Sequence, residues 1–161
     1  MTEHVVEISR STDQVDEEPD ERQIIDWLKD ALSRLDCGQS EVSVRIVSED
    51  EMTSLNRQYR DRNQPTNVLS FPSGIEAEGR LFLGDIVVCA AVVRKEAQEF
   101  NKPVEERYAH MMVHGLLHLL GHDHAEVADQ EKMEVLEKLL LASVDISDPY
   151  ELMNGAMEKV R

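Results

Sequence analysis

The sequence predicts an α+β fold in which a small mixed β-sheet is packed by about five or six helices. Three observations lead to this prediction. The length of 161 residues suits one domain with a core that needs no disulfide bridges. Apolar residues make up 41% of the chain and charged residues 31%, which is typical of a globular protein. Segments with strand and helix periodicity are mixed without a strict βαβ repeat, so we treat residues 1–161 as a single domain.

Four segments have the pattern of β-strands. Residues 4–9 alternate weakly, and residues 42–46 alternate between Val or Ile and polar side chains, which is typical of a half-buried strand. A short strand is expected over 67–71, between two prolines. Residues 81–89 form a more apolar strand that contains a glycine and an aspartate.

Helical periodicity accounts for most of the remaining chain. Gly38 is expected to end the first helix, and Ser48 with Glu51 forms a capping-box pattern at the start of the second. Proline is tolerated in the first turn of a helix, so Pro103 and Pro149 mark two further helix starts. The helices are expected near 24–35, 48–59, 90–100, 103–121 and 129–141, with a last short one after Pro149.

The formal net charge of −16 speaks against general nucleic-acid binding, which depends on Lys and Arg contacts to phosphate. The charge is uneven, however. Residues 13–21 hold six carboxylates, whereas residues 57–62 hold three arginines and one aspartate, so a locally basic face is compatible with an acidic body.

Two features predict a cytoplasmic protein with no membrane partner. The chain has neither an apolar run near the ~20 residues that a membrane helix needs nor a basic and apolar leader at its start. Cys37 and Cys89 are expected to be reduced thiols. The oligomeric state is not predicted.

Three histidines in one short segment form the main candidate site. His114 and His118 are four residues apart, which on a helix separates them by about 40° and ~6 Å, so both rings can reach one ion. Gly121 lies where the helix should end, because glycine adopts the left-handed conformation that follows a helix without a side-chain penalty. The chain can then turn back and bring His124 to the same ion.

The neighbours of these histidines support a metal site. Apolar residues cover most of the helix circumference, which is typical of a buried helix, and burial favours the neutral imidazole that binds metals. Three imidazoles suit one Zn²⁺ and leave an open position for catalysis, although nickel, copper and iron accept the same ligands. The alternative is a set of buried histidines paired with backbone or carboxylates. His110 is a possible substitute ligand, and the roles of His122 and Asp123 stay open.

The spacing His-x-x-x-His-x-x-Gly-x-x-His is that of the metzincin peptidases, which makes the predicted metal site zincin-like. Those enzymes place a glutamate directly after the first histidine, where it acts as general base. In this sequence that position is Gly115. The metal ligands are therefore present without the peptidase base, which disfavours peptide hydrolysis.

With Gly115 in that position, the sequence closely resembles the YbeY family of bacterial endoribonucleases. The resemblance covers about Val42 to Leu140. His122 departs from it, since many members have tyrosine there, but the three ligand positions are unchanged. The matching motifs are Leu55-Asn56 with Tyr59-Arg60, then Pro65-Thr66-Asn67-Val68-Leu69-Ser70-Phe71-Pro72, then Leu83-Gly84-Asp85-Ile86, and then the histidine segment.

The resemblance implies one zinc ion bound by His114, His118 and His124, and cleavage of single-stranded RNA. It implies a role in maturation of the 3′ end of 16S ribosomal RNA and in ribosome quality control, with ribosomal RNA and the small subunit or its proteins as partners. It also marks Arg60 as a functional residue. Independently, a guanidinium can hold a phosphate by two hydrogen bonds and offset its charge. The alternative for Arg60 is a salt bridge on a helix surface.

Other polar residues near these motifs have two interpretations each. Asp85 lies in an apolar strand and would either orient a ligand histidine or serve a structural role. Asn67 and Ser70 would line the cleft or stabilise a strand edge, and Arg57 and Arg62 would be solvated residues or weak RNA contacts.

The leading hypothesis is hydrolysis of an RNA phosphodiester with metal-activated water, although attack by the 2′-hydroxyl is an open alternative. Because Gly115 replaces the usual base, the sequence identifies no general base. Two other functions stay open. One is a zinc peptidase or amidohydrolase with a base from elsewhere. The other is a non-catalytic, metal-stabilised assembly factor whose acidic surface binds basic ribosomal proteins.

Overall fold

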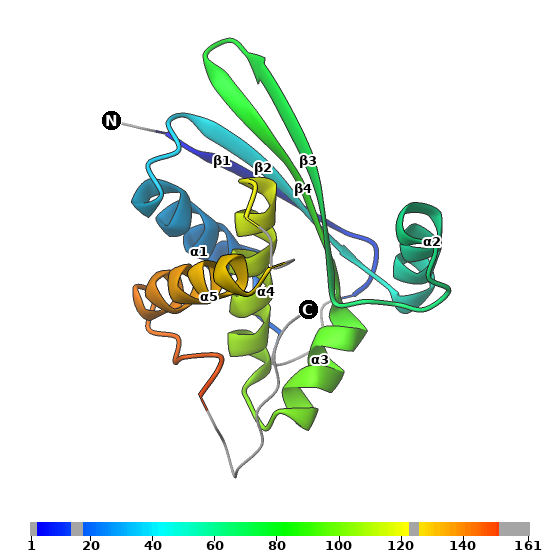
Figure 1. The fold of residues 1–161 in the computed structure, drawn as a ribbon. Coiled ribbons are helices and arrows are strands. Elements are labelled where there is room, and N and C mark those ends of the chain that lie inside the picture. Colours follow the sequence, from blue (N-terminus) through cyan, green and yellow to red (C-terminus); the bar gives the residue numbers. More distant parts are fainter. Residues whose placement is uncertain (1–2, 14–17, 123–125, 152–161) are drawn as a thin grey trace.

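The computed structural model describes residues 3–13, 18–122 and 126–151. Its centre is a four-stranded mixed sheet in the order β1-β2-β4-β3 (Figure 1). Strands β1, β2 and β4 are parallel, and β3 pairs antiparallel with β4 at one edge. The strands are β1 (Val5–Arg10), β2 (Ser40–Val47), β3 (Val68–Ala77) and β4 (Arg80–Cys89).

Five helices surround this sheet in the described part of the chain. They are α1 (Glu21–Arg34), α2 (Glu49–Arg60), α3 (Ala90–Glu99), α4 (Val104–Leu119) and α5 (Val127–Ala142). Figure 1 shows α1, α4 and α5 together on one side of the sheet, α2 on the other side beyond β3, and α3 directly after β4. The predicted α+β fold is confirmed.

Alternation along the strands divides the core in two. In β4, Ile86 and Val88 belong to the large cluster that includes α1, α4 and α5. The residues between them, Val87 and Cys89, belong to a smaller cluster with Met52 of α2. Successive side chains of a strand point to opposite faces, so the two clusters lie on opposite faces of one sheet. Any side chain of β3 or β4 is thereby assigned either to the α4 side or to the α2 side.

Two helix ends differ from the sequence predictions. The helix expected to end at Gly38 ends at Arg34, because Asp36 takes the left-handed conformation (φ 53°) that closes it. At α2, Ser48 accepts a hydrogen bond from the backbone N–H of Glu51, but the Glu51 side chain pairs with Arg45 instead of completing the box. The described chain has its capping box on α1, between Asp20 and Gln23.

Strand β3 is longer than the predicted strand over 67–71, because it continues through Pro72 to Ala77. An edge strand tolerates proline, and the register with β4 shifts just after it, between Pro72 and Ile75. Glu78 and Gly79, both with positive φ, form the tight turn into β4. The resulting hairpin extends past the other strands (Figure 1).

Gly84 lets β3 and β4 approach each other closely. Its φ of 139° is accessible to glycine, and a Cβ at this position would lie 2.2 Å from the carbonyl oxygen of Phe71. The glycine in the predicted apolar strand is therefore a requirement of this strand pairing.

The chain directly after residues 14–17 of the acidic N-terminal segment is anchored in the core. Residues 14–17 lie outside the described ranges, but Glu18 is buried and accepts hydrogen bonds from Tyr108 and Arg94. At the other end, residues 149–150 form a turn, and the remainder of the predicted last helix lies outside the described residues. Within the described ranges, no helix is long and apolar enough to cross a membrane.

Candidate metal centre

Helix α4 carries the predicted histidine pair through the middle of the molecule. Every residue from Arg107 to Leu117 is buried, as the apolar circumference of this segment predicts. The helix ends at Leu119, and Gly121 (φ 96°) takes the left-handed conformation expected where the helix stops. The N–H of Gly121 bonds to the carbonyl of His118, and that of His122 to the carbonyl of Leu117, which is a Schellman motif.

His114 and His118 lie side by side on this helix. Their ring centroids are 4.7 Å apart and the ring planes make an angle of 67°. His114 is buried and His118 is half-buried, so the pair lies where the core meets the surface. Two of the three predicted ligands are thus close enough to share an ion. His124, the third, lies outside the described residues and stays a prediction.

A buried carboxylate lies directly behind His114. Glu137 of α5 places Oε2 2.7 Å from Nδ1 of His114, and its other oxygen is 3.3 Å from Nε2 of His110. The Glu137 side chain is 1% exposed. His110, His114 and Glu137 each offer one ligand atom within 4.8 Å of the others, so this cluster could hold a metal ion.

Sequence reasoning considered His110 only as a substitute ligand and missed Glu137. The available signal was the position of Glu137 on α5, four residues after Met133 and three before Leu140, both of which are buried. A glutamate at a core-facing helix position is rare unless it is paired. The pairing partner itself is contributed by another helix, so helix periodicity alone does not identify it.

The electrostatics of this cluster favour an ionised Glu137 carboxylate and a neutral His110 ring. Burial by itself would raise the pKa of Glu137, but hydrogen bonds and charge interactions with His110 and His114 outweigh burial and lower it. The pKa of His110 is lowered mainly by burial, against the opposing influence of Glu137. A neutral imidazole is the form that coordinates metals. Imidazole nitrogens with a carboxylate are a donor set that suits zinc and similar ions.

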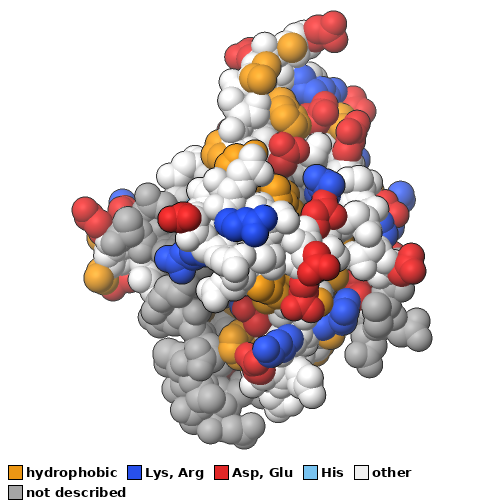
Figure 2. All heavy atoms as spheres, turned by 90° about the vertical axis from the view of Figure 1, so that its right-hand side faces the viewer, with side chains coloured by type: hydrophobic (Ala, Val, Ile, Leu, Met, Phe, Trp, Pro, Cys, Tyr) orange, Lys and Arg blue, Asp and Glu red, His pale blue; other side chains and the backbone are white. Residues whose placement is uncertain are grey.

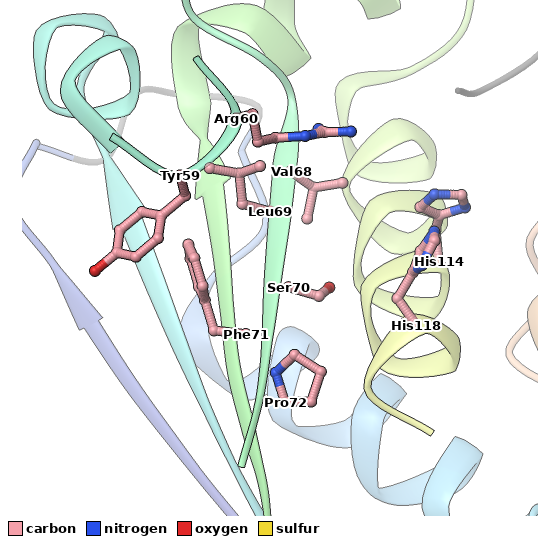
Figure 3. Close-up of a pocket in the computed structure, with 9 residues that line it drawn as sticks. All are labelled: Tyr59, Arg60, Val68, Leu69, Ser70, Phe71, Pro72, His114 and His118. Carbon is pink, nitrogen blue, oxygen red and sulfur yellow. The ribbon is translucent and has the colours of Figure 1, made fainter. Parts of the chain in front are cut away.

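The histidine pair opens into a cleft of about 430 Å³ between α4, β3 and the end of α2. Figure 3 shows the Arg60 guanidinium extending over β3 toward the rings of His114 and His118. Arg60 is the last residue of α2 and is exposed. The described residues include no ion-pair partner for it, so the surface salt bridge considered as its alternative role is absent from this part of the chain.

Close packing of α4 against the sheet explains why a glycine, and not a glutamate, follows His114. A Cβ at this position would lie 2.9 Å from Cγ2 of Ile86 and 3.2 Å from Oγ of Ser70. The helix therefore contacts the sheet at the position where a metzincin carries its base. Ser70 also donates a hydrogen bond to the carbonyl of Gly115 over 2.9 Å. A longer side chain here would separate α4 from the sheet.

The structure decides between the two interpretations given for each of Asp85, Asn67 and Ser70. Asp85 pairs across the sheet with Phe71, on the α2 side, so alternation directs it away from the histidines and rules out the suggested role of orienting them. Asn67 donates a hydrogen bond to Glu96 of α3 and accepts one from the N–H of Val68, which ties the start of β3 to α3. Asn67 thus has a structural role, whereas Ser70 both lines the cleft and holds α4.

The face that carries α2 and the outer edge of β3 has a mixed charge. Figure 2 shows Lys and Arg side chains interspersed among Asp and Glu side chains on this face. The expected basic stretch at residues 57–62 therefore adds local positive charge without forming a continuous basic surface.

Comparisons with known proteins identify the family of this chain. The family model described as "Endoribonuclease YbeY" matches residues 5–145. A protein of that name from Cellvibrio japonicus is 47% identical over 147 residues, covering 91% of this chain and 81% of the relative. Another from Halorhodospira halophila is 48% identical over 137 residues, covering 83% and 88%.

A solved structure is similar as well. The solution structure of a Thermotoga maritima protein matches with a TM-score of 0.56 and 28% identity, covering 92% of this chain and all of the other. The family match spans all four strands, the cleft and the helix that carries the histidines. This chain therefore belongs to the YbeY endoribonuclease family.

Proposed function

We propose that this protein is a metal-dependent endoribonuclease that cleaves single-stranded RNA. The observation that carries the proposal is the arrangement of the cleft. Arg60 extends toward His114 and His118, and all three residues line the same cleft of about 430 Å³. A phosphate held by Arg60 would lie beside the two imidazoles. The relatives are named endoribonucleases, which supports RNA as the substrate class.

Each residue has a defined part in the proposed reaction. His114, His118 and His124 hold one metal ion, for which zinc is the first choice and nickel or another transition metal an alternative. A bound metal supplies activated water near neutral pH and polarises a phosphoryl oxygen. Arg60 binds the phosphate by paired hydrogen bonds and offsets the charge that develops on it. The edge strand β3, whose Ser70 and Pro72 face the histidines, forms the opposite wall of the cleft (Figure 3).

We further propose that the substrate is ribosomal RNA, with cleavage contributing to maturation of the 3′ end of 16S RNA and to ribosome quality control. The family resemblance supports this finer assignment, and it implies cytoplasmic action with the small subunit or its proteins as partners. The net charge of −16 also suits contact with basic ribosomal proteins.

The activity is tested by cleavage of a fluorescent single-stranded RNA by purified protein, with and without a chelator. We expect His114→Ala and His118→Ala to abolish cleavage and Arg60→Ala to lower kcat/KM by about 100-fold, a loss typical of a charge-stabilising donor. Arg22→Ala is the matched control, because Arg22 is an arginine of α1 that is 84% exposed. Cleavage that persists unchanged in the His114→Ala, His118→Ala double variant would exclude this protein as the source of activity.

The same proteins separate the two other functions. A zinc peptidase or amidohydrolase would degrade casein or an amide substrate and leave RNA intact. A non-catalytic assembly factor would allow folded metal-ligand variants to restore ribosomal RNA processing in a depleted strain. We expect neither result, and rescue by the His118→Ala variant would refute the catalytic proposal.

A further inference from the structure

A chain of buried hydrogen bonds behind His114 fixes the proton positions on two histidines. Arg107 places Nη1 3.3 Å from Nδ1 of His110, and a guanidinium can only donate hydrogen bonds. Nδ1 of His110 is therefore the acceptor, and its ring proton lies on Nε2. That nitrogen is 3.3 Å from both Oε1 of Glu137 and the hydroxyl of Tyr150. His110 thus has its lone pair engaged by Arg107, which makes it a support for Glu137 and a poor metal ligand.

The same reasoning places the proton of His114 on the other ring nitrogen, Nδ1. An ionised carboxylate can only accept hydrogen bonds, and Oε2 of Glu137 lies 2.7 Å from Nδ1 of His114. Nδ1 of His114 therefore carries the proton and donates it. The lone pair of this ring therefore lies on Nε2, which is the nitrogen that would bind a metal. Metal-binding histidines generally donate their other ring N–H to a carboxylate in this way.

Tyr150 holds the second oxygen of Glu137. Its hydroxyl donates a hydrogen bond to Oε1 of Glu137, and its ring packs edge-on against His110 with centroids 5.3 Å apart. Tyr150 comes from the segment after α5, which returns to the histidine helix. The carboxylate is therefore fixed by three elements: α4, α5 and the C-terminal segment.

We propose that Glu137, oriented by Tyr150 and His110, is a positioning residue of the metal site. It keeps the proton of His114 on Nδ1 and thereby directs the Nε2 lone pair of His114 to the metal. The inference rests on the proposed function in taking His114 as a metal ligand. It adds a carboxylate and a tyrosine to the machinery without making either of them a ligand.

The structure offers a matched control for this pair. Glu18 is a second buried glutamate that accepts a hydrogen bond from a tyrosine, Tyr108, over 2.9 Å. Tyr108 and His110 are two residues apart on α4, so they point to nearly opposite sides of the helix. Substitutions at Glu18 and Tyr108 remove the same chemical groups from the core without touching His114.

The test is the affinity of the full-length protein for Zn²⁺, measured by competition with a chromogenic chelator. We expect Glu137→Gln to weaken zinc binding by about 10- to 100-fold, the usual effect of removing such a support, and Tyr150→Phe to weaken it by a smaller factor. Glu18→Gln and Tyr108→Phe should stay within about twofold of the wild type. Tyr150→Phe removes a single hydroxyl, so it serves if Glu137→Gln does not fold.

A second measurement needs no metal. In ¹⁵N-histidine spectra of the metal-free protein, His114 should carry its proton on Nδ1 in the wild type and in Glu18→Gln. In Glu137→Leu the ring should populate both tautomers, because the acceptor is gone. A purely structural role for Glu137 would leave the tautomer unchanged.

The outcomes distinguish this inference from the proposed function. Zinc affinity that is unchanged in Glu137→Gln but lost in His114→Ala overturns the inference and leaves the metal site intact. Zinc binding that survives His114→Ala overturns the proposed metal site and the inference with it. Equal losses in Glu137→Gln and Glu18→Gln also refute the inference, since they would reflect general destabilisation.

Discussion

Two buried glutamates, each bonded to a tyrosine, lie on different sides of α4 and have different partners. The side chain of Glu18 has no exposed surface and pairs with Arg94 at 2.7 Å. Glu137 is equally buried but pairs with His110 and His114, and the nearby arginine, Arg107, pairs with Glu96. Glu18 thus has a fixed positive partner, whereas the partners of Glu137 that the structure describes are two imidazoles and the Tyr150 hydroxyl.

The difference shows how the same residue type serves structure in one place and a site in another. Buried charges in proteins are either paired or associated with metals. Arg94 neutralises Glu18, so that cluster is complete and ties the N-terminal segment to α3 and α4. The carboxylate of Glu137 is instead hydrogen-bonded to His114, whose ring lines the cleft. A cation bound there would complete the charge balance that the Glu18 cluster already has.

The largest expected effect tests whether the Glu18 cluster is purely structural. Arg94→Ala would remove the cation that pairs with the buried carboxylate of Glu18 and should lower the free energy of unfolding by about 3 kcal/mol, measured by urea denaturation. Zinc affinity should not change. Lys95→Ala, at the next and exposed position of α3, is the control and should change stability by less than about 0.5 kcal/mol. A loss in Arg94→Ala no larger than in this control would contradict the assignment.

Metal binding should stabilise the folded protein through the cluster of Glu137 and His114, and not through the Glu18 cluster. Free Zn²⁺ at 100 times its dissociation constant should raise the free energy of unfolding by about 2.7 kcal/mol. The same increment is expected in Arg94→Ala, because that substitution leaves His114 intact, and little of it in His114→Ala. Urea denaturation with zinc and with chelator measures each increment. An increment lost in Arg94→Ala would mean that the clusters are coupled.

Tyr108 and Tyr150 should differ as their glutamate partners do, with Tyr108 important for stability and Tyr150 for zinc binding. Burial, and then the adjacent carboxylates, raise the pKa of Tyr108 and of Tyr150 far above the ordinary value, so neither should contribute tyrosinate absorbance until the protein unfolds. A hydrogen bond to a charged group contributes about 2 kcal/mol, so Tyr108→Phe should lower the free energy of unfolding by that amount. Tyr150→Phe should cost less stability, since Tyr150 is only half-buried, but should weaken zinc binding. The reverse pattern would undo the comparison.

The smallest effect concerns His4, a buried ionisable group whose two ring nitrogens have no hydrogen-bond partner among the residues that the structure describes. Burial, and then the charges of Lys29 and Arg80, lower its pKa from 6.5. As the pH falls below that value, the unfolded chain binds a proton that the folded chain excludes, so stability is lost. Between about pH 7.5 and 5.5, the wild type should lose about 1 kcal/mol more than His4→Leu.

His110 is buried with a lowered pKa in both of these proteins, so the difference between them isolates His4. As a control, the two proteins should show parallel stability above about pH 7.5, where His4 is neutral in both states. Identical acid sensitivity in the two proteins would show that His4 does not contribute.

Local patterns in the sequence were enough for much of the fold and part of the site. The spacing of His114 and His118 and the glycine at 121 follow from helix geometry, which involves only neighbours along the chain. The absence of a base at Gly115 was also evident from the sequence. The extent of β3 was not, because proline ends a strand in one setting and is tolerated in another, and only the position of β3 at the sheet edge distinguishes them.

The sequence by itself determined an α+β fold, a helix with two adjacent imidazoles, and a family with a recognisable set of motifs. The placement of His124 stays a prediction of that sequence. Only the tertiary structure placed Glu137 and Tyr150 behind His114, aimed Arg60 into the cleft, and put Asp85 on the wrong face to assist. The physical reason is range: helix spacing and turns are set within a few residues, whereas the proton position on His114 depends on a carboxylate 23 residues away on another helix.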